Sequence, residues 1–453
     1  MTHTRTGAPF AVLLALTPVW VSPALAQDAP GLSGTFSFSQ TLNATDNPGF
    51  VADPADGSVE ARTRLGFTLD SATRTETFRL SLGTVYEGGL DGNGDDFEFV
   101  RDSASVNYTR EGAASRLSLG ASYDESELDD IEIELDFDPD LLTLDGGSVQ
   151  RIGANARLET GIGAPFGVTL SGRYNETNYL NTIDPDLENS ESLGLDATAS
   201  FRINPTLTAR ALAGISRTRE DDVTATKRDR RYIGFGFSGD LARGLSFSGN
   251  ITYDEVETST NAPSSTIDDG VGLTLSVTQA RPNGTLGATF SSRIDEGGRL
   301  TQARINRSLD LPDGSLSFSL GIIDPETSGT RPVASLDYSR ETARGALSAR
   351  VSQSPTTDDG ETVLNTAIRL NYSQAINDIS GWSAGLSYSE ANTLGSDDDI
   401  SRTSASVSYR RDLAQDWDLR AGYSYSVREE TAEPDRTENS LFLSLERDFS
   451  FGF

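Results

Sequence analysis

The chain ends in SLFLSLERDFSFGF, residues 440–453, and in this stretch every second residue from Leu441 onward is apolar or aromatic except Arg447. A period of two is typical of a β-strand with one apolar face. Arg447 interrupts that face and predicts a shifted register or a bulge at this point. Three exposed terminal phenylalanines would make a soluble protein prone to aggregation. The stretch therefore predicts a strand that faces lipid.

The same alternation recurs along the whole chain. Val59, Leu65 and Leu69 alternate with Glu60 and Arg64, for example. About 22 such segments are recognisable, and they leave no room for long helices. The connectors between them are expected to alternate strictly between a few residues and about ten or more, as the turns and loops of a membrane barrel do. The sequence thus predicts an all-β, transmembrane antiparallel barrel of about 20 to 22 strands that closes between its first and last strands.

Composition restricts the chemistry that the chain can perform. It contains no Cys, its one His is His3, and 68 acidic against 37 basic residues give a net charge of -31. Polyanions such as nucleic acid are therefore poor partners for its surface. Without His and Cys beyond the first residues, the usual general base, zinc ligand and thiol nucleophile are missing. We expect no enzyme activity, no catalytic residues and no cofactor.

The first 26 residues have the features of a secretory signal peptide. Arg5 lies in a polar start, an apolar run follows from Pro9 to Val21, and Ala24-Leu-Ala26 supplies the small residues of a cleavage site. A membrane-anchoring helix is the alternative, but the run is short and contains Pro18. We expect residues 1–26 to be removed and residues 27–453 to form the barrel, with no plug domain between them.

Both ends of the chain resemble those of Gram-negative outer-membrane β-barrel proteins of the porin type. The resemblance implies that the barrel-assembly machinery reads the terminal aromatic residues Phe449, Phe451 and Phe453. It also implies a location in the cell outer membrane, contact with outer-membrane lipid and lipopolysaccharide, short periplasmic turns and long extracellular loops. An acidic soluble β-protein or a repeat solenoid is the alternative architecture.

Aromatic side chains gather near the ends of the expected strands, where a barrel meets the two lipid-water boundaries. The preference of tyrosine for strands in general accounts for part of this pattern. These residues are Tyr86, Tyr108, Tyr123, Tyr174, Tyr253, Tyr338, Tyr372, Tyr388, Tyr409, Trp382 and Trp417.

Arginine recurs on the face expected to line the lumen, among Ser, Thr, Asn and Gly. Guanidinium groups on a water-filled wall attract anions and bind sugars or carboxylates. Alternatively, they pair with the inward carboxylates Glu60, Asp70, Asp196, Asp337 and Asp418 and form a nearly neutral network. The predicted pore-lining arginines are Arg62, Arg64, Arg79, Arg101, Arg116, Arg151, Arg157, Arg173, Arg210, Arg350, Arg369, Arg402 and Arg420.

A barrel of this size needs something that narrows its lumen. The longest expected loop, Glu125 to Gly147, alternates acidic residues with Ile and Leu. We predict that it folds inward as a constriction, or else stands above the membrane as a small hairpin. The acidic residues of this constriction loop are Glu125, Asp129, Asp130, Glu132, Glu134, Asp136 and Asp138.

One acidic loop contains oxygen ligands at alternate positions, in Asp91, Asn93 and Asp95. This spacing opens a calcium-binding loop, although Asp96 stands where such a loop needs Gly. Ca²⁺ binding at this extracellular loop is one interpretation, and a solvated acidic turn is the other.

The sequence as a whole predicts an outer-membrane channel. We expect a porin-like passage for small hydrophilic solutes or a saccharide through an arginine-lined lumen, and no energy-coupling segment is recognisable. The alternative is a structural, receptor or adhesion barrel with acidic extracellular loops and a blocked lumen. The transported solute, the ion selectivity and the oligomeric state are not readable from the sequence.

Overall fold

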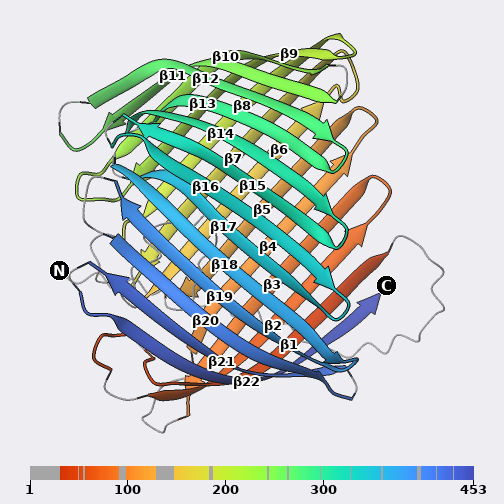
Figure 1. The fold of residues 1–453 in the computed structure, drawn as a ribbon, viewed down its shortest axis with the longest axis vertical. Coiled ribbons are helices and arrows are strands. Elements are labelled where there is room, and N and C mark those ends of the chain that lie inside the picture. The colour runs from red at the N-terminus through yellow and green to blue at the C-terminus, as the bar shows by residue number, and fades with distance from the viewer. Residues whose placement is uncertain are drawn as a thin grey trace, which may run out of the picture.

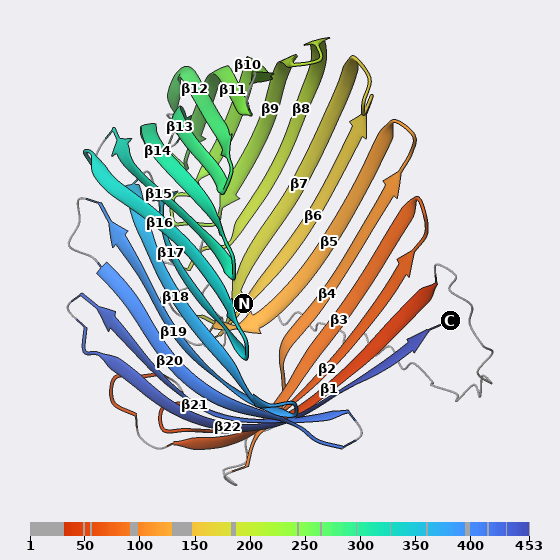
Figure 2. The same ribbon diagram turned by 45° about the vertical axis from the view of Figure 1, so that its right-hand side comes forward.

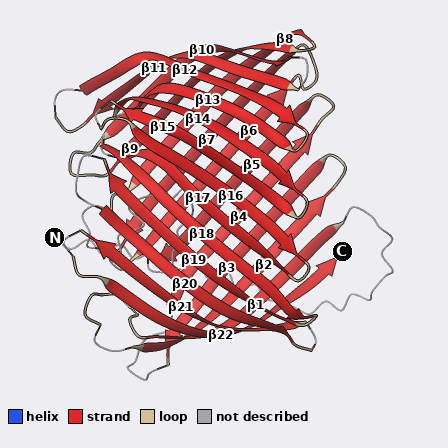
Figure 3. Ribbon diagram, in the orientation of Figure 1, coloured by secondary structure: helices blue, strands red, loops and turns tan. Residues whose placement is uncertain are grey.

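The computed structural model describes residues 31–452 except 49, 55–56, 91–97, 129–146, 183–186, 242–243, 263–264, 296, 327, 359–360, 395–398, 415 and 432. It shows 22 β-strands that form one barrel wall (Figures 1 and 3). Each strand pairs antiparallel with its neighbours in sequence, and β22 pairs with β1. The predicted fold class, strand number and closure are confirmed.

The strands are β1 (Leu32–Thr45), β2 (Ser58–Ala72), β3 (Glu76–Gly89), β4 (Glu98–Glu111), β5 (Ser115–Glu127), β6 (Ser148–Thr160), β7 (Phe166–Leu180), β8 (Ser190–Asn204), β9 (Leu207–Glu220), β10 (Lys227–Leu241), β11 (Leu245–Ser259), β12 (Ser265–Arg281), β13 (Gly284–Asp295), β14 (Gly298–Leu311), β15 (Gly314–Pro325), β16 (Arg331–Thr342), β17 (Gly345–Asp358), β18 (Glu361–Asn377), β19 (Ser380–Thr393), β20 (Asp399–Asp412), β21 (Trp417–Glu430) and β22 (Arg436–Gly452). They run obliquely around the wall (Figure 2). Among the residues that the structure describes, no helix is long and apolar enough to cross a membrane.

The barrel has two distinct ends. Ser33 lies opposite Gly452, so β1 begins where β22 ends. We call this the turn end, because short connectors such as 112–114 and 205–206 lie here. The opposite end, the loop end, contains the longest connectors, 46–57 and 128–147. In outer-membrane barrels the short turns are periplasmic and the long loops extracellular.

The expected strict alternation of short and long connectors is wrong for much of the chain. Connectors at the loop end remain long only up to β8, and after that they are as short as 260–264 or 296–297. Strands extend into stretches expected to be loops, so that β11 and β12 take up most of the loop expected from Thr258 to Asp269. A strand of 14 residues tilted by about 40° rises roughly 35 Å, beyond an apolar band about 25 Å tall. The surplus length continues to pair its backbone outside the membrane.

The register at Arg447 is regular, so the predicted shift or bulge at this residue is wrong. Both partners of β22 pair without interruption, Trp417 and Phe38 lying opposite Arg447. The guanidinium lies over the rings of Phe449 and Trp417, 4.5 and 5.5 Å from their centroids. Cation–π contact keeps the charge at the apolar surface without breaking the strand. The register shifts instead in β3–β4, β8–β9 and β18–β19.

Polar contacts join the first and last strands at the loop end. The backbone N–H of Asn439 donates to Oδ1 of Asp46 at 2.7 Å, and the Asn439 side-chain amide donates to Oδ2 at 2.7 Å. The Tyr423 hydroxyl donates to Oδ1 of Asn439 at 2.5 Å. The hydrogen bonds from Asn439 hold the pKa of Asp46 below its ordinary value of 3.8. The charged carboxylate therefore stabilises the closing seam.

Acid is expected to loosen this seam. Because the pKa of Asp46 is lower in the folded state, its contribution to stability is fully present above about pH 4 and is lost as the pH falls through the lowered pKa. In the variant Asp46→Asn we expect the backbone amide hydrogen of Asn439 to exchange faster than in the parent at neutral pH. In acid the two proteins should exchange it at the same rate. Hydrogen exchange of both proteins, compared at each pH, tests this. Equal exchange at neutral pH would show that the charge is not needed.

Candidate functional site

The strand register divides every strand into an inner and an outer face. Residues directly opposite each other on paired strands share a face. Exposed apolar residues such as Phe36, Leu65 and Leu82 gather on one face, as expected of a wall surrounded by lipid. All thirteen arginines predicted to line the lumen lie on the other, inner face.

Most of these arginines have a carboxylate partner on the same wall. Apart from the contact between Arg62 and Glu87, the nitrogen-to-oxygen distances lie between 2.5 and 4.0 Å. The pairs are Arg62 with Glu60 and Glu87, Arg79 with Asp70, Arg101 with Asp124, Arg116 with Glu111 and Glu159, Arg157 with Glu159, Arg173 with Asp196, Arg350 with Asp337, and Arg420 with Glu446.

The pairing changes the electrostatic character of the lumen. All five inward carboxylates named from the sequence have an arginine partner, Asp418 pairing with Arg410 at 3.6 Å. Most of these side chains are half-exposed, and such pairs contribute only about 0–1 kcal/mol each to stability. Their main effect is to cancel charge. The described wall is therefore closer to the neutral network than to a row of free cations.

The other five predicted arginines have different surroundings. Within the described part of the chain, Arg64, Arg151 and Arg210 make no ion pair, and the Nε of Arg210 is buried without a hydrogen-bond partner. Arg369 lies directly opposite Arg350, like charge against like charge. Arg402 lies beneath the ring of Phe50, 5.4 Å from its centroid.

Apolar side chains line the inner wall at the loop end, where sequence reasoning expected polar ones. Buried residues form three clusters there, which we call the collar. They are Leu128, Val149, Tyr179 and Leu187; Leu300, Ile323, Val333 and Leu394; and Val363, Ala367 and Ala391. Most come from strand ends, whereas Leu128, Leu187 and Leu394 lie in connectors, Leu128 and Leu394 directly after β5 and β19. These three leucines therefore pack onto the barrel from beyond the strand ends.

The collar has a signal in the sequence that the alternating pattern concealed. A strand with one apolar and one polar face should not place two large apolar residues side by side. Ile322 and Ile323 do so near the end of β15. Ile323 belongs to the collar and is buried, whereas Ile322 is exposed. Such doublets at strand ends indicate where both faces are apolar.

The first connector at the loop end also folds inward. Asn47, 1% exposed, donates from Nδ2 to the backbone oxygens of Val51 and Thr437 at 2.8 Å each. These bonds place the 3% exposed Phe50 over Arg402, which lies three strands away from β1. The sequence predicted an inward-folded connector at residues 125–147, not at this one.

Several predicted sites lie outside the described residues. These are the calcium ligands Asp91, Asn93 and Asp95, the assembly residue Phe453, and the constriction loop from Asp129 to Asp138, together with the signal peptide, residues 1–26. Within the ranges that are described, no group of three or more Asp, Glu, His or Cys residues could hold a metal ion.

Glu125 is the described member of the predicted constriction loop, and its assignment to that loop is wrong. It belongs to β5 and lies on the outer face with Tyr123, whose hydroxyl donates to its carboxylate. The strand extends beyond the expected start of the loop because its backbone continues to pair with β6 as far as Glu127.

The terminal aromatic residues pack on the outer side of the seam. Phe449 and Phe36 lie with ring centroids 6.1 Å apart, and Phe451 stacks on Phe67 at 6.4 Å. Both phenylalanines are exposed, Phe449 by 40% and Phe451 by 38%. Both lie on the surface that a membrane protein presents to lipid.

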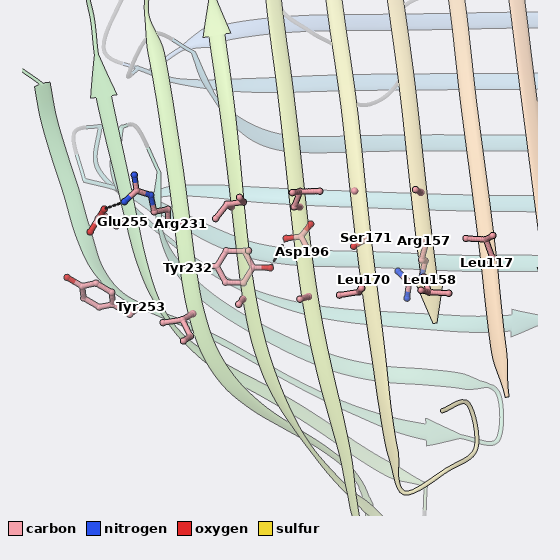
Figure 4. Close-up of a pocket in the computed structure, with 18 residues that line it drawn as sticks. Leu117, Arg157, Leu158, Leu170, Ser171, Asp196, Arg231, Tyr232, Tyr253 and Glu255 are labelled. Carbon is pink, nitrogen blue, oxygen red and sulfur yellow. Dashed lines mark hydrogen bonds and ion pairs between the residues drawn. The ribbon is translucent and has the colours of Figure 1, made fainter. Parts of the chain in front are cut away.

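A long groove of about 800 Å³ crosses the wall from β5 to β11 (Figure 4). Small residues such as Ala197 and Ala213 and larger ones such as Leu170 and Ile215 line it. Their register positions place the groove on the outer face. It is therefore a depression in the lipid-facing wall and lies off any route through the lumen.

Comparison with solved structures identifies the kind of barrel. The ferric enterobactin receptor PfeA of Pseudomonas aeruginosa matches with a TM-score of 0.57 and 9% identity over 94% of this chain and 82% of its own. The chain has the fold of a Gram-negative outer-membrane β-barrel protein. The ferric-catecholate import receptor Fiu of E. coli K12 matches over 93% and 82% of the two chains, with 13% identity and a TM-score of 0.57. The FrpB iron transporter of Neisseria meningitidis covers 91% and 82%, with 9% identity and a TM-score of 0.59.

These matches establish the fold and the outer-membrane location, because a closed barrel with an apolar outer belt fits that membrane. The loop end is accordingly the extracellular end and the turn end the periplasmic end. No protein-family model and no curated protein sequence matches the chain. The matched structures are named as two receptors and a transporter.

Proposed function

We propose that the barrel is an outer-membrane receptor that admits a small solute and is closed at its extracellular end until the solute binds. The collar supports this proposal most directly, because Leu187 and Leu394, which lie outside the strands, are buried against apolar residues of the inner wall. A permanently water-filled mouth would leave these side chains exposed, at a cost of about 2 kcal/mol each. The solved receptors with this fold point in the same direction.

The lumen network supports a receptor as well. The paired arginines leave few cationic groups to concentrate anions along the wall. The net charge of -31 adds a negative field that repels small anions. We therefore propose a neutral or cationic solute. Because other matched structures are named as siderophore receptors, PiuA and PirA of Acinetobacter baumannii among them, ferric siderophore complexes are the first class to test.

Conductance of the mature protein in planar bilayers tests the closed state. We expect no steady open steps before a solute is added, because the collar closes the extracellular end. A porin would show stable steps at once, and such steps would contradict the proposal.

Equilibrium dialysis with two ferric complexes of similar size tests the solute class. We expect a neutral trihydroxamate complex to be retained and a triply negative tricatecholate complex to be excluded, because the acidic field repels the anion. Raising the salt concentration should reduce the difference. Retention of the anionic complex alone would overturn the proposed charge preference, and retention of neither would exclude this class of solute.

A further inference from the structure

A short motif recurs at the periplasmic ends of three strands. Tyr108-Thr-Arg-Glu111 ends β4, Tyr338-Ser-Arg-Glu341 lies near the end of β16, and Tyr409-Arg-Arg-Asp412 ends β20. In each copy an arginine follows the tyrosine by two positions and is itself followed by an acidic residue. On β22, Arg447 and Asp448 repeat the last two positions without the tyrosine.

The alternation of the strand separates the two charges of this motif. Tyr409 and Arg411 lie on the outer face, and Asp412 lies on the lumen face opposite Asp418. The lumen uses the acidic position, since Asp412 pairs with Arg410 at 3.0 Å and Glu111 with Arg116 at 2.7 Å. The outward arginine is thus positioned toward lipid.

Five arginines lie on the outer face within four residues of a periplasmic strand end, Arg447 lying farther up β22, and we call these five the outer arginines. They are Arg110, Arg281, Arg307, Arg340 and Arg411.

Three outer arginines, Arg281, Arg340 and Arg411, are exposed and make no hydrogen bond or ion pair with another described residue. Arg110 pairs with Glu76 at 3.4 Å, and Arg307 donates to Asn283 at 2.7 Å. Among described strand residues, Glu76 is the one acidic side chain on this part of the outer face. The periplasmic rim of the outer face therefore has an excess of positive charge.

The extracellular rim differs from the periplasmic one. Outward arginines there, such as Arg217 and Arg231, pair with acids, and several outward tyrosines are followed two positions later by glutamate, as in Tyr174 and Glu176, whose hydroxyl and carboxylate are 2.7 Å apart. Tyr388 and Glu390 repeat the spacing. The same tyrosine position thus precedes an acid at one membrane boundary and an arginine at the other. General solvation of strand ends does not explain this reversal, since both rims face water.

We propose that the outer arginines bind the phosphate groups of glycerophospholipids in the periplasmic leaflet. A guanidinium group donates two parallel hydrogen bonds to a phosphate, and tyrosine rings lie at the depth of lipid head groups. An outward arginine costs little at the membrane boundary and much more at the bilayer centre. A phosphate at the boundary converts this small cost into an attraction.

Native mass spectrometry of the mature protein in a non-ionic detergent, titrated with phosphatidylglycerol, tests the proposal. The variant Arg281→Gln/Arg340→Gln/Arg411→Gln removes the three outer arginines that lack protein partners. We expect its lipid affinity to fall about fivefold for each arginine removed, from the attraction of one basic residue to an anionic lipid. High salt should weaken binding to the parent protein.

The matched control is Arg64→Gln/Arg151→Gln/Arg210→Gln, which makes the same change of charge on the lumen face. It should bind phosphatidylglycerol as the parent does, and both triple variants should retain the β-sheet circular dichroism of the parent. A galactosyl diacylglycerol with the same acyl chains lacks phosphate. It should bind equally to the parent protein and to the variant Arg281→Gln/Arg340→Gln/Arg411→Gln. Equal phosphatidylglycerol binding by the two triple variants, or equal binding of galactolipid and phosphatidylglycerol by the parent, would overturn the proposal.

Discussion

The variant Leu187→Ser/Leu394→Ser is expected to convert a silent barrel into a conducting one. Both side chains are nearly buried, with exposures of 7% and 8%. Leu187 packs with Val149 and Tyr179, and Leu394 with Ile323 and Val333. Because each change removes an apolar side chain and leaves the backbone intact, it releases the contact with the inner wall while the hydrogen bonds of the wall remain, including the one from the Leu394 N–H to Thr362.

The magnitude favours opening of the connectors over unfolding of the barrel. Removing a buried leucine costs roughly 2–5 kcal/mol. This is a large share of the free energy that holds such a residue against the inner wall. We expect stable conductance steps in planar bilayers where the parent shows none. Val223→Ser is the control, because Val223 lies in another connector at the same end and is 92% exposed. A double variant as silent as the control would show that the collar does not close the barrel.

Gly34→Val is expected to weaken closure of the barrel. Gly34 lies opposite Phe451, and a Cβ added there would lie 2.3 Å from the Phe451 ring. The ring is also stacked on Phe67, so moving it disturbs two contacts at the closing seam. Overpacking of this kind costs about 1–3 kcal/mol. We expect the folded fraction to reach its midpoint at a lower urea concentration when the protein is refolded into vesicles.

Gly452→Val supplies the matched control for the seam. Gly452 lies opposite Ser33 at the same end of the seam, and a Cβ added there meets no atom within 4 Å. This variant should refold as the parent does. If Gly34→Val and Gly452→Val have the same midpoint, contact between Phe451 and the Gly34 backbone does not support closure.

The sequence predicted the wall well because the wall depends on local alternation. Leu65 and Phe67 differ from Arg64 and Thr68 in polarity at every step, and in a closed barrel each strand needs only its two neighbours to pair its backbone. The inner position of all thirteen arginines follows from the same alternation. The outward Arg447 shows the limit of this reasoning, because two aromatic rings accommodate its charge where the sequence suggested a break.

Alternation by itself therefore determined that the chain forms a closed barrel, which residues face lipid, and which arginines face the lumen. Only the tertiary structure decided which charges pair, since Arg79 meets Asp70 and Arg420 meets Glu446 across neighbouring strands whose register is not written in either strand alone. It also decided that connectors fold onto the inner wall, as Phe50 does over Arg402. Faces follow from the period of two along one strand, whereas pairing and closure depend on contacts between residues far apart in the chain.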